Sequence, residues 1–135
     1  MGLIEKLLNK RVFIDTAPFI YYMEKHSHFG VIAKPIFENI EKGSIEAITS
    51  NITLLEVLVQ PYRTDNGKLA KKYRDILLNA ERLTTFEVTH EISENAAKLR
   101  AKYYIRTPDA IQISTALNMN ADIFLTNDEA LKMKH

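Results

Sequence analysis

The sequence has no cysteine, no strong excess of either charge and no apolar run long enough to span a membrane. Without cysteine the fold contains no disulfide, so it needs no oxidising compartment. The first ten residues, MGLIEKLLNK, are too short and too charged for a signal peptide or a membrane span. We therefore expect a cytoplasmic protein without a membrane segment.

The charge balance limits how the chain can meet nucleic acid. Eighteen basic side chains stand against seventeen acidic ones, which gives a net charge of +1. A protein that coats nucleic acid through a global positive field carries a much larger excess. Any contact with nucleic acid must therefore be local.

The length of 135 residues is enough for one domain with a sizeable core. We find no internal repeat and no low-complexity linker, so residues 1–135 are predicted to form a single domain. Residues 1–10 read as a short amphipathic helical extension that packs either on this domain or on a partner. The sequence leaves both alternatives open.

Short apolar runs that end in polar residues predict strands at 12–14, 45–49, 84–88 and 123–125. Segments with helical spacing alternate with them, at 18–28, 31–42, 52–59, 68–81, 91–104, 108–117 and 129–134, and residues 61–67 read as a polar loop. Such alternation predicts an α/β fold, a three-layer sandwich whose mostly parallel central sheet has helices on both faces.

Four acidic residues are expected at one edge of this sheet. Asp15 and Asp128 follow strands, whereas Glu56 and Asp109 lie near the starts of helices. Ligands of open α/β sheets bind at the carboxyl ends of the strands. A cluster of carboxylates without lysine or arginine among them stays ionised only beside a cation, and hard oxygen ligands favour Mg²⁺ or Mn²⁺. The chemistry that fits is phosphoryl transfer to water.

Each acid also has a purely structural interpretation. Asp15 or Thr16 would cap the helix that Pro18 opens, and Glu56 would form a capping box with Thr53. Asp109 suits the first turn of a helix that Thr107 caps, where its charge interacts with the helix dipole. Asp128 would cap the final helix. Asp122 precedes the last strand and should lie at the opposite edge of the sheet.

A basic surface is predicted around the helix at 68–81, whose outer face, together with the preceding loop, carries Arg63, Lys71, Lys72 and Arg74. These cations are candidates for contact with a phosphate backbone, and a solvated helix face is the alternative. His26 and His28 are separated by two positions and would point to different faces of a helix. They are therefore expected to be surface residues rather than a metal pair.

The most specific segments are VFIDTAPFIYYME, AITSNITLLEVLVQP, RTPDAIQISTAL and ADIFLTND. Through them the chain resembles PIN-domain nucleases and, within these, the VapC-type toxins of toxin-antitoxin pairs. The resemblance covers nearly everything after Lys10.

The resemblance implies a Mg²⁺-dependent endoribonuclease that cuts single-stranded or structured RNA by attack of a metal-activated water. Asp15 and Asp109 would lie nearest the metal, with Glu56 and Asp128 completing the acidic pocket. Supporting residues would be Thr16, Thr126 and Asn127. The family resemblance also implies a homodimer and a small antitoxin partner.

Two other aspartate-based families fit poorly. A phosphatase of the haloacid-dehalogenase type needs an acid two residues after the first-strand aspartate, where this chain has Ala17. A response-regulator receiver needs an acidic pair beside its first strand, which is missing. A non-catalytic PIN module, acting as a scaffold that binds RNA or protein, stays the alternative to the nuclease.

Overall fold

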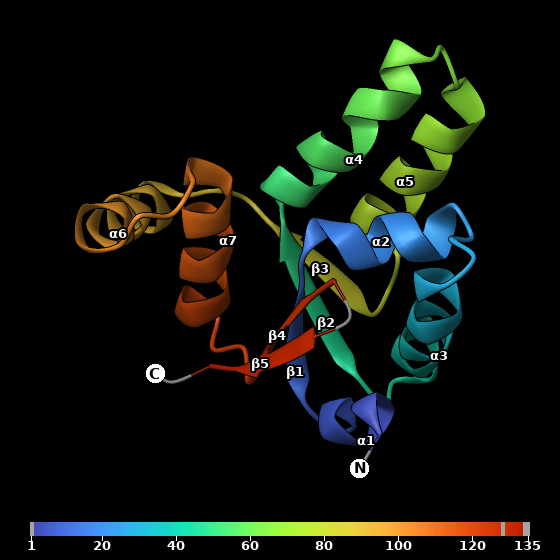
Figure 1. Ribbon diagram of the computed structural model, residues 1–135, viewed down its shortest axis with the longest axis horizontal. Helices are drawn as coiled ribbons and strands as arrows, with labels where there is room; N and C mark the ends of the chain where they lie inside the picture. The colour runs from blue at the N-terminus through green and yellow to red at the C-terminus, as the bar shows by residue number, and fades with distance from the viewer. Residues whose placement is uncertain (1, 128, 134–135) are drawn as a thin grey trace.

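The computed structural model describes residues 2–127 and 129–133 (Figure 1). Its strands are β1 Arg11–Ile14, β2 Glu46–Ser50, β3 Leu83–Phe86, β4 Ile123–Thr126 and β5 Glu129–Lys132. Its helices are α1 Leu3–Leu7, α2 Thr16–Met23, α3 Phe29–Lys42, α4 Asn51–Arg63, α5 Gly67–Asn79, α6 His90–Lys102 and α7 Thr107–Asn118.

The strands form one sheet in the order β3-β2-β1-β4-β5. The first strand, β1, is therefore central, with β2 and β3 on one side and β4 and β5 on the other. Strands β1 to β4 are parallel, and β5 runs antiparallel to β4. In β1, Val12 is paired with Ala47 of β2 and with Ile123 of β4. The prediction of a mostly parallel sheet is confirmed.

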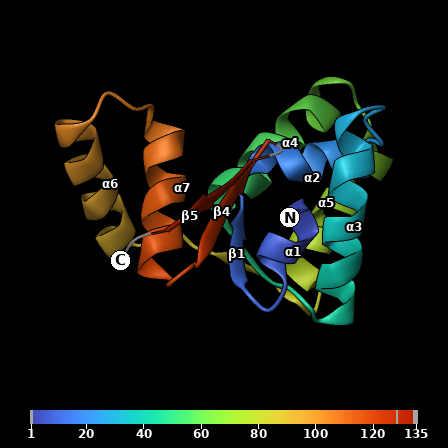
Figure 2. The ribbon, with the colours of Figure 1, turned by 60° about the horizontal axis from the view of Figure 1, so that its bottom comes forward.

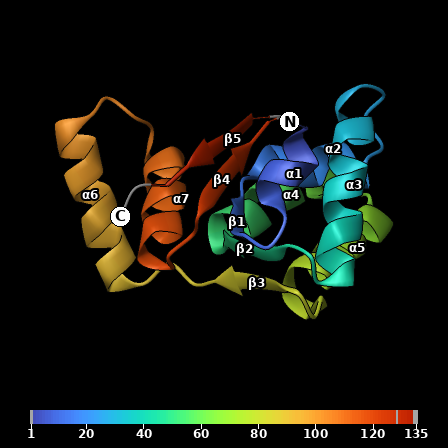
Figure 3. The same cartoon turned by 90° about the horizontal axis from the view of Figure 1, so that it is seen from below.

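Helices cover both faces of the sheet, which confirms the three-layer prediction. Figures 2 and 3 show α6 and α7 on one side, with α1 to α5 on the other. Successive residues of a strand point to opposite faces. Val12 and Ile14 therefore enter the larger core beneath α2 and α3, whereas Phe13 joins the smaller core, where its ring stacks on Phe124 at 5.2 Å beside Ala116 of α7.

The N-terminal helix α1 packs on its own domain. Leu7 is completely buried in the larger core, and Leu3 and Ile4 pack against the same cluster. Of the two alternatives for this extension, the structure shows the first. No described helix has the length and apolar composition needed to cross a membrane.

The prediction of a helix at 129–134 is wrong where the structure describes it, because residues 129–132 form β5. Asn127 has a left-handed backbone, with φ of 51°, at the turn between β4 and β5. The chain then reverses and pairs Thr126 with Glu129 and Ile123 with Lys132. Pairing with β5 satisfies main-chain groups of β4 that would otherwise form an open sheet edge.

The polar loop predicted at 61–67 is shorter in the structure and covers residues 64–66, because α4 continues through Pro61 to Arg63 and α5 begins at Gly67. Proline removes one N–H and its ring crowds the carbonyl four residues earlier. Pro61 is nevertheless kept in the last turn of α4, where it is buried and its carbonyl accepts from the N–H of Asn66 at 2.8 Å. Asn66 then caps α5 by accepting from the N–H of Leu69. The resulting α4–α5 hairpin extends beyond the carboxyl ends of the strands (Figure 1).

Candidate active site

Asp15 is fixed at the carboxyl end of the central strand. Its backbone N–H donates to the carbonyl of Leu125 at 2.9 Å, which places it one residue beyond the paired part of β1. Its Oδ1 accepts from the N–H of Thr16 at 2.8 Å, and its Oδ2 accepts from the hydroxyl of Thr126 at 2.9 Å. Asp15 is also the N-cap residue of α2. The capping role therefore coexists with a carboxylate held in one orientation at the sheet edge.

Glu56 is joined to this site through Thr16. The hydroxyl of Thr16 donates to Glu56 Oε1 at 2.6 Å, across from α2 to α4. The capping box predicted for Glu56 is wrong, because α4 begins at Asn51 and its cap is Ser50, whose side chain accepts from the N–H of Ile52 at 3.1 Å. The N-cap residue lies three positions before Thr53, so the Glu56 carboxylate is not needed at the helix start and faces α2.

Asp109 lies in the first turn of α7 and is paired with an arginine. Arg106 Nε donates to Asp109 Oδ2 at 3.1 Å. Arg106 is itself the N-cap residue, without a side-chain capping bond, so the predicted cap at Thr107 is wrong. The hydrogen bond and charge of Asp109 raise the pKa of Arg106, with smaller contributions from the charges of Glu56 and Asp15.

The position of Arg106 corrects a premise drawn from the sequence. We expected an acidic cluster without lysine or arginine, but a guanidinium lies within the field of all three described acids. The signal was present in the sequence, since residues three apart on a helix are neighbours and Arg106 precedes Asp109 by three positions.

Gln112 is a central residue of the site that the sequence reasoning missed. It is only 1% exposed, and its amide donates to Thr53 Oγ1 at 2.7 Å and to Asp15 Oδ1 at 3.3 Å. Its carbonyl oxygen accepts from the hydroxyl of Ser50. One buried side chain on α7 therefore ties together β1, α4 and the cap of α4. Its spacing of three from Asp109 places both on the same side of α7 and was the available signal.

The donor chemistry of this site fits a hard divalent cation. Three carboxylates face one guanidinium, which leaves an excess of negative charge that a cation would neutralise. Within the described residues no three acidic or histidine side chains stand close enough together to hold a metal ion. Mg²⁺, however, is commonly bound by one or two carboxylates together with waters and substrate phosphates. A site of that kind needs only two of the three acids described above.

Of the other residues predicted for the site at the end of β4, one contacts the acids and one does not. Thr126 contacts Asp15 directly, whereas Asn127 is exposed and its Oδ1 accepts from the hydroxyl of Tyr21 at 3.5 Å. Asp128 lies outside the described residues. Asp122 accepts from the N–H of Arg11 at 2.9 Å, at the start of β1, which confirms that it lies at the opposite edge of the sheet.

The side chains of the predicted basic surface are exposed, and two of them already interact with neighbouring side chains. Lys71 Nζ forms an ion pair with Asp75 at 2.8 Å, which lowers the pKa of Asp75, and Arg74 donates to the hydroxyl of Tyr62 at 3.0 Å. Arg63 and Lys72 are exposed as well.

The two histidines near the start of α3 are exposed, as expected. His26 Nδ1 accepts from the N–H groups of His28 and Phe29, at 3.2 and 3.1 Å. This nitrogen therefore closes the turn before α3.

Comparison with known proteins adds the family context. The sequence model of the PIN domain family matches residues 12–134. No curated protein matches the chain. Three solved structures are similar. One is VapBC2 from Rickettsia felis bound to promoter DNA, and the second is the sarcin-ricin loop cleaving toxin VapC20 from Mycobacterium tuberculosis. The third is a toxin-antitoxin complex from Klebsiella pneumoniae.

These structures share the fold at low sequence identity. The R. felis chain is 20% identical with a TM-score of 0.68, and 87% of each chain is covered. The M. tuberculosis chain is 16% identical with a TM-score of 0.69, covering 82% of this chain and 85% of that one. The K. pneumoniae chain is 22% identical with a TM-score of 0.64, covering 85% and 84%.

Proposed function

Because this chain belongs to the PIN domain family, we propose that it is a Mg²⁺-dependent endoribonuclease and the toxin of a toxin-antitoxin pair. The observation that carries the proposal is the fixed carboxylate of Asp15. It lies at the carboxyl end of the central parallel strand, where ligands of such sheets bind, and Thr126 and Gln112 hold both of its oxygens.

Each residue of the site has a distinct part in this proposal. Asp15 and Asp109 would hold Mg²⁺, which when bound polarises the phosphodiester and lowers the pKa of an attacking water. Thr16 and Thr126 orient the acids by donating hydrogen bonds to Glu56 and Asp15. Glu56 and Asp128 complete the negative charge of the pocket, and Asn127 supports it from the end of β4.

The substrate in this proposal is single-stranded or structured RNA. Single strands and loops expose bases that a duplex hides, and the backbone supplies phosphates for basic side chains. Arg63, Lys71, Lys72 and Arg74 are proposed to contact these phosphates. All four are exposed, on the α4–α5 hairpin.

Protein partners are the second part of the proposal: a cognate antitoxin and a second copy of the chain. The structures described above include toxin-antitoxin complexes with this fold. On α4, Leu55, Val59 and Tyr62 are exposed at a spacing of four and three residues, so they form one apolar face. Such a face supports a protein contact, and a molar mass of one or two chains, measured by analytical ultracentrifugation, tests the homodimer.

One observation favours the alternative, a non-catalytic PIN module. Arg106 forms an ion pair with Asp109, as expected where an arginine rather than a metal ion balances the acid. The two functions are separated by incubating the protein with single-stranded RNA in Mg²⁺, Mn²⁺, Ca²⁺ or chelator.

For the nuclease we expect cleavage with Mg²⁺ or Mn²⁺ alone, no cleavage by Asp15→Asn, and products with 5′-phosphate and 3′-hydroxyl ends, as water attack requires. Products ending in 2′,3′-cyclic phosphate would overturn the metal mechanism, since they require attack by the 2′-hydroxyl. RNA that binds but is never cut would instead support the scaffold.

A further inference from the structure

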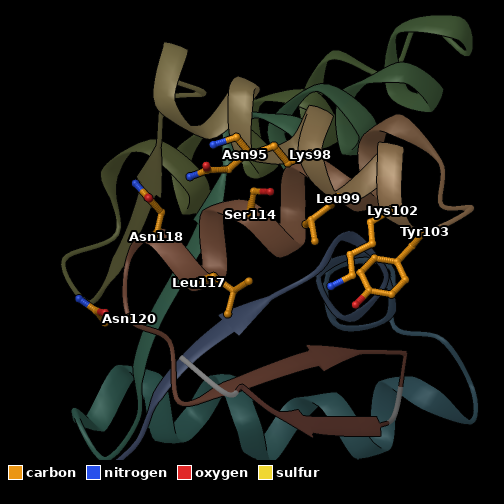
Figure 4. Close-up of a pocket in the computed structure, with 9 residues that line it drawn as sticks. All are labelled: Asn95, Lys98, Leu99, Lys102, Tyr103, Ser114, Leu117, Asn118 and Asn120. Carbon is orange, nitrogen blue, oxygen red and sulfur yellow. The ribbon is translucent and has the colours of Figure 1, made fainter.

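A groove of about 560 Å³ lies between α6 and α7 (Figure 4), and Gln112 is not among the residues that line it. Lys98 and Lys102 of α6 line one wall, and Ser114 and Asn118 of α7 line the other. Pockets of a few hundred to about 1,000 Å³ accommodate small organic ligands, so this groove has room for a nucleotide. None of the acids described above lines it.

Ser114 is the feature that points to a ligand. Its side chain is 2% exposed, and its hydroxyl is the single buried side-chain polar atom without a hydrogen-bond partner among the described residues. A buried hydroxyl without a partner is unfavourable, because it has lost its water without replacement. Ser114 lines the groove, so a ligand with a donor or acceptor edge would satisfy it.

The charge of the groove selects an anionic ligand. No acidic residue lines it, and neither Lys98 nor Lys102 takes part in an ion pair within the described part of the chain. The ammonium of Lys102 lies 5.5 Å from the ring centroid of Tyr103, at the mouth of the groove. Two free cations beside an aromatic ring suit a phosphate that is linked to a planar base.

The remaining polar groups are suited to the edge of a base. Asn95, Asn118 and Asn120 place three carboxamides around the groove, and none of them makes a side-chain hydrogen bond within the described residues. A carboxamide both donates and accepts, as the edges of nucleobases do. The main chain of an acidic peptide could also bond these carboxamides, but its carboxylate side chains carry no planar ring to stack on Tyr103.

The chain that links the groove to the acidic site is basic and aromatic. Residues 98–106 read KLRAKYYIR, with four cations and no acid. Tyr103 is exposed and Tyr104 fully so, while Arg106 ends the segment in contact with Asp109. Aromatic platforms between cations are typical of surfaces that bind single-stranded nucleic acid. This segment is more basic than α5, and the sequence reasoning passed over it.

We propose that the α6–α7 groove and residues 103–106 bind single-stranded RNA, with one nucleotide in the groove and the strand continuing over Tyr103 and Tyr104 to Asp109. The proposal rests on the proposed nuclease function, since it names how that site receives its substrate. The base meets Ser114 and the asparagines, and the phosphates meet the lysines.

Binding is tested in chelator, where RNA is not cut, by fluorescence anisotropy of a labelled oligoribonucleotide of about eight nucleotides. The chain lacks tryptophan, so Tyr103→Trp supplies a single reporter whose emission should be quenched when a base stacks on it. Lys98→Gln with Lys102→Gln should lower affinity about tenfold or more. It should also reduce the slope of log affinity against log salt by about 1.4, or 0.7 for each lost phosphate contact.

Lys6→Gln with Lys42→Gln is the matched control, because these exposed lysines carry the same charge outside the groove. Ser114→Ala should weaken binding without changing the salt slope, since it removes a hydrogen bond but no charge. Equal affinities and slopes in the groove variant and the control would overturn the proposal.

Displacement of the RNA by poly-glutamate, with no quenching of the indole emission in the Tyr103→Trp variant, would also overturn the proposal, in favour of an acidic peptide. RNA that binds as expected but is never cut in Mg²⁺ would support the proposed RNA groove and contradict the proposed nuclease function.

Discussion

Arg106 donates from Nε to Oδ2 of Asp109 at 3.1 Å, so the residue before α7 neutralises the acid in its first turn. The two side chains are 79% and 44% exposed, and exposed pairs of this kind are weak. In the proposed function, a divalent cation would therefore compete with Arg106 for Asp109. The charges of Glu56 and Asp15 also raise the pKa of Arg106, so this guanidinium is a counter-ion for all three described acids.

The first prediction concerns this counter-ion. Arg106→Gln removes a positive charge from a site with three carboxylates, so Mg²⁺ should bind several-fold more tightly while the metal-free protein becomes less stable. Calorimetric titration with Mg²⁺ measures the affinity, and thermal unfolding in chelator measures the stability. Lys10→Gln, at an exposed position just before β1, is the control. An unchanged Mg²⁺ affinity would show that Arg106 does not compete with the ion.

The second prediction is that Asp109→Asn gains less stability from Mg²⁺ than the wild-type chain does. Ligand-linked stabilisation reaches about 2.7 kcal/mol at a hundredfold excess over Kd, and it requires an intact site. In chelator the lost dipole interaction, about 0.3–1 kcal/mol, opposes the relief of repulsion from Asp15 and Glu56, so the net change should be small.

Glu91→Gln is the matched control for Asp109, since Glu91 is the exposed acid in the first turn of α6. It should lose a similar dipole interaction and keep the full gain from Mg²⁺. If Asp109→Asn behaves like Glu91→Gln in both conditions and still cuts RNA, Asp109 is a capping-turn residue only.

Much of the site could be predicted because strand ends are legible in the sequence. Asp15 and Thr126 follow apolar runs that are parallel neighbours, so their contact follows from topology alone. Gln112 and Arg106 were missed for a different reason. Their importance depends on which way a helix faces, and neither residue type marks a site until its partners are known.

The errors in the fold come from local signals that tertiary structure overrides. Pro61 looks like a helix end, but its burial against the domain keeps it inside α4. Residues 129–132 were expected to form a helix, and pairing with β4 made them a strand. Of the four parallel strands, β1 and β4 were marked most clearly, because each is a short apolar run that ends in polar residues, the pattern of a strand covered on both faces.

The third prediction addresses the basic face of α5. Replacing Lys71, Lys72 and Arg74 together with glutamine should weaken binding of single-stranded RNA and reduce its salt dependence if this face tracks phosphates. The reduction should be less than the value of about 2.1 expected for three free cations, because Lys71 is paired with Asp75 and Arg74 with Tyr62. Anisotropy across a salt series measures it. An unchanged slope would show that these residues form a solvated helix face and do not contact phosphates.

The fourth prediction concerns alkaline stability. Tyr73 is completely buried and its hydroxyl donates to Glu24; burial and this carboxylate raise its pKa far above the usual value. A raised folded-state pKa contributes stability below the unfolded-state pKa of about 10. Above that pH the unfolded chain ionises first, so the free energy of unfolding should fall by about 1.4 kcal/mol per pH unit.

Tyr73→Phe should remove this component of the pH dependence. Denaturant unfolding of both proteins between pH 8 and about 11 measures the two slopes. Tyr104→Phe, at a fully exposed position, should leave the slope of the wild-type chain unchanged. Equal slopes in the Tyr73 variant and the wild type would assign the alkaline loss to other groups.

The fifth prediction separates packing from positioning at Gln112. Gln112→Leu keeps the approximate volume but leaves the Ser50 hydroxyl without its acceptor and Asp15 without one donor. Unsatisfied buried groups of this kind cost about 1–3 kcal/mol, so the midpoint of denaturant unfolding should fall. Gln60→Leu, at an exposed position on α4, should change it little.

Gln112→Glu separates the two roles by the dependence of stability on pH and Mg²⁺, which a purely structural role of Gln112 would not produce. The glutamate keeps an acceptor for Ser50 but places a carboxylate beside Oδ1 of Asp15, where like charges repel. Its stability at neutral pH should therefore be lower than in mild acid, and Mg²⁺ should restore part of it by neutralising the pair. If its unfolding midpoint is independent of both pH and Mg²⁺, Gln112 lies too far from the charge of Asp15 to position it.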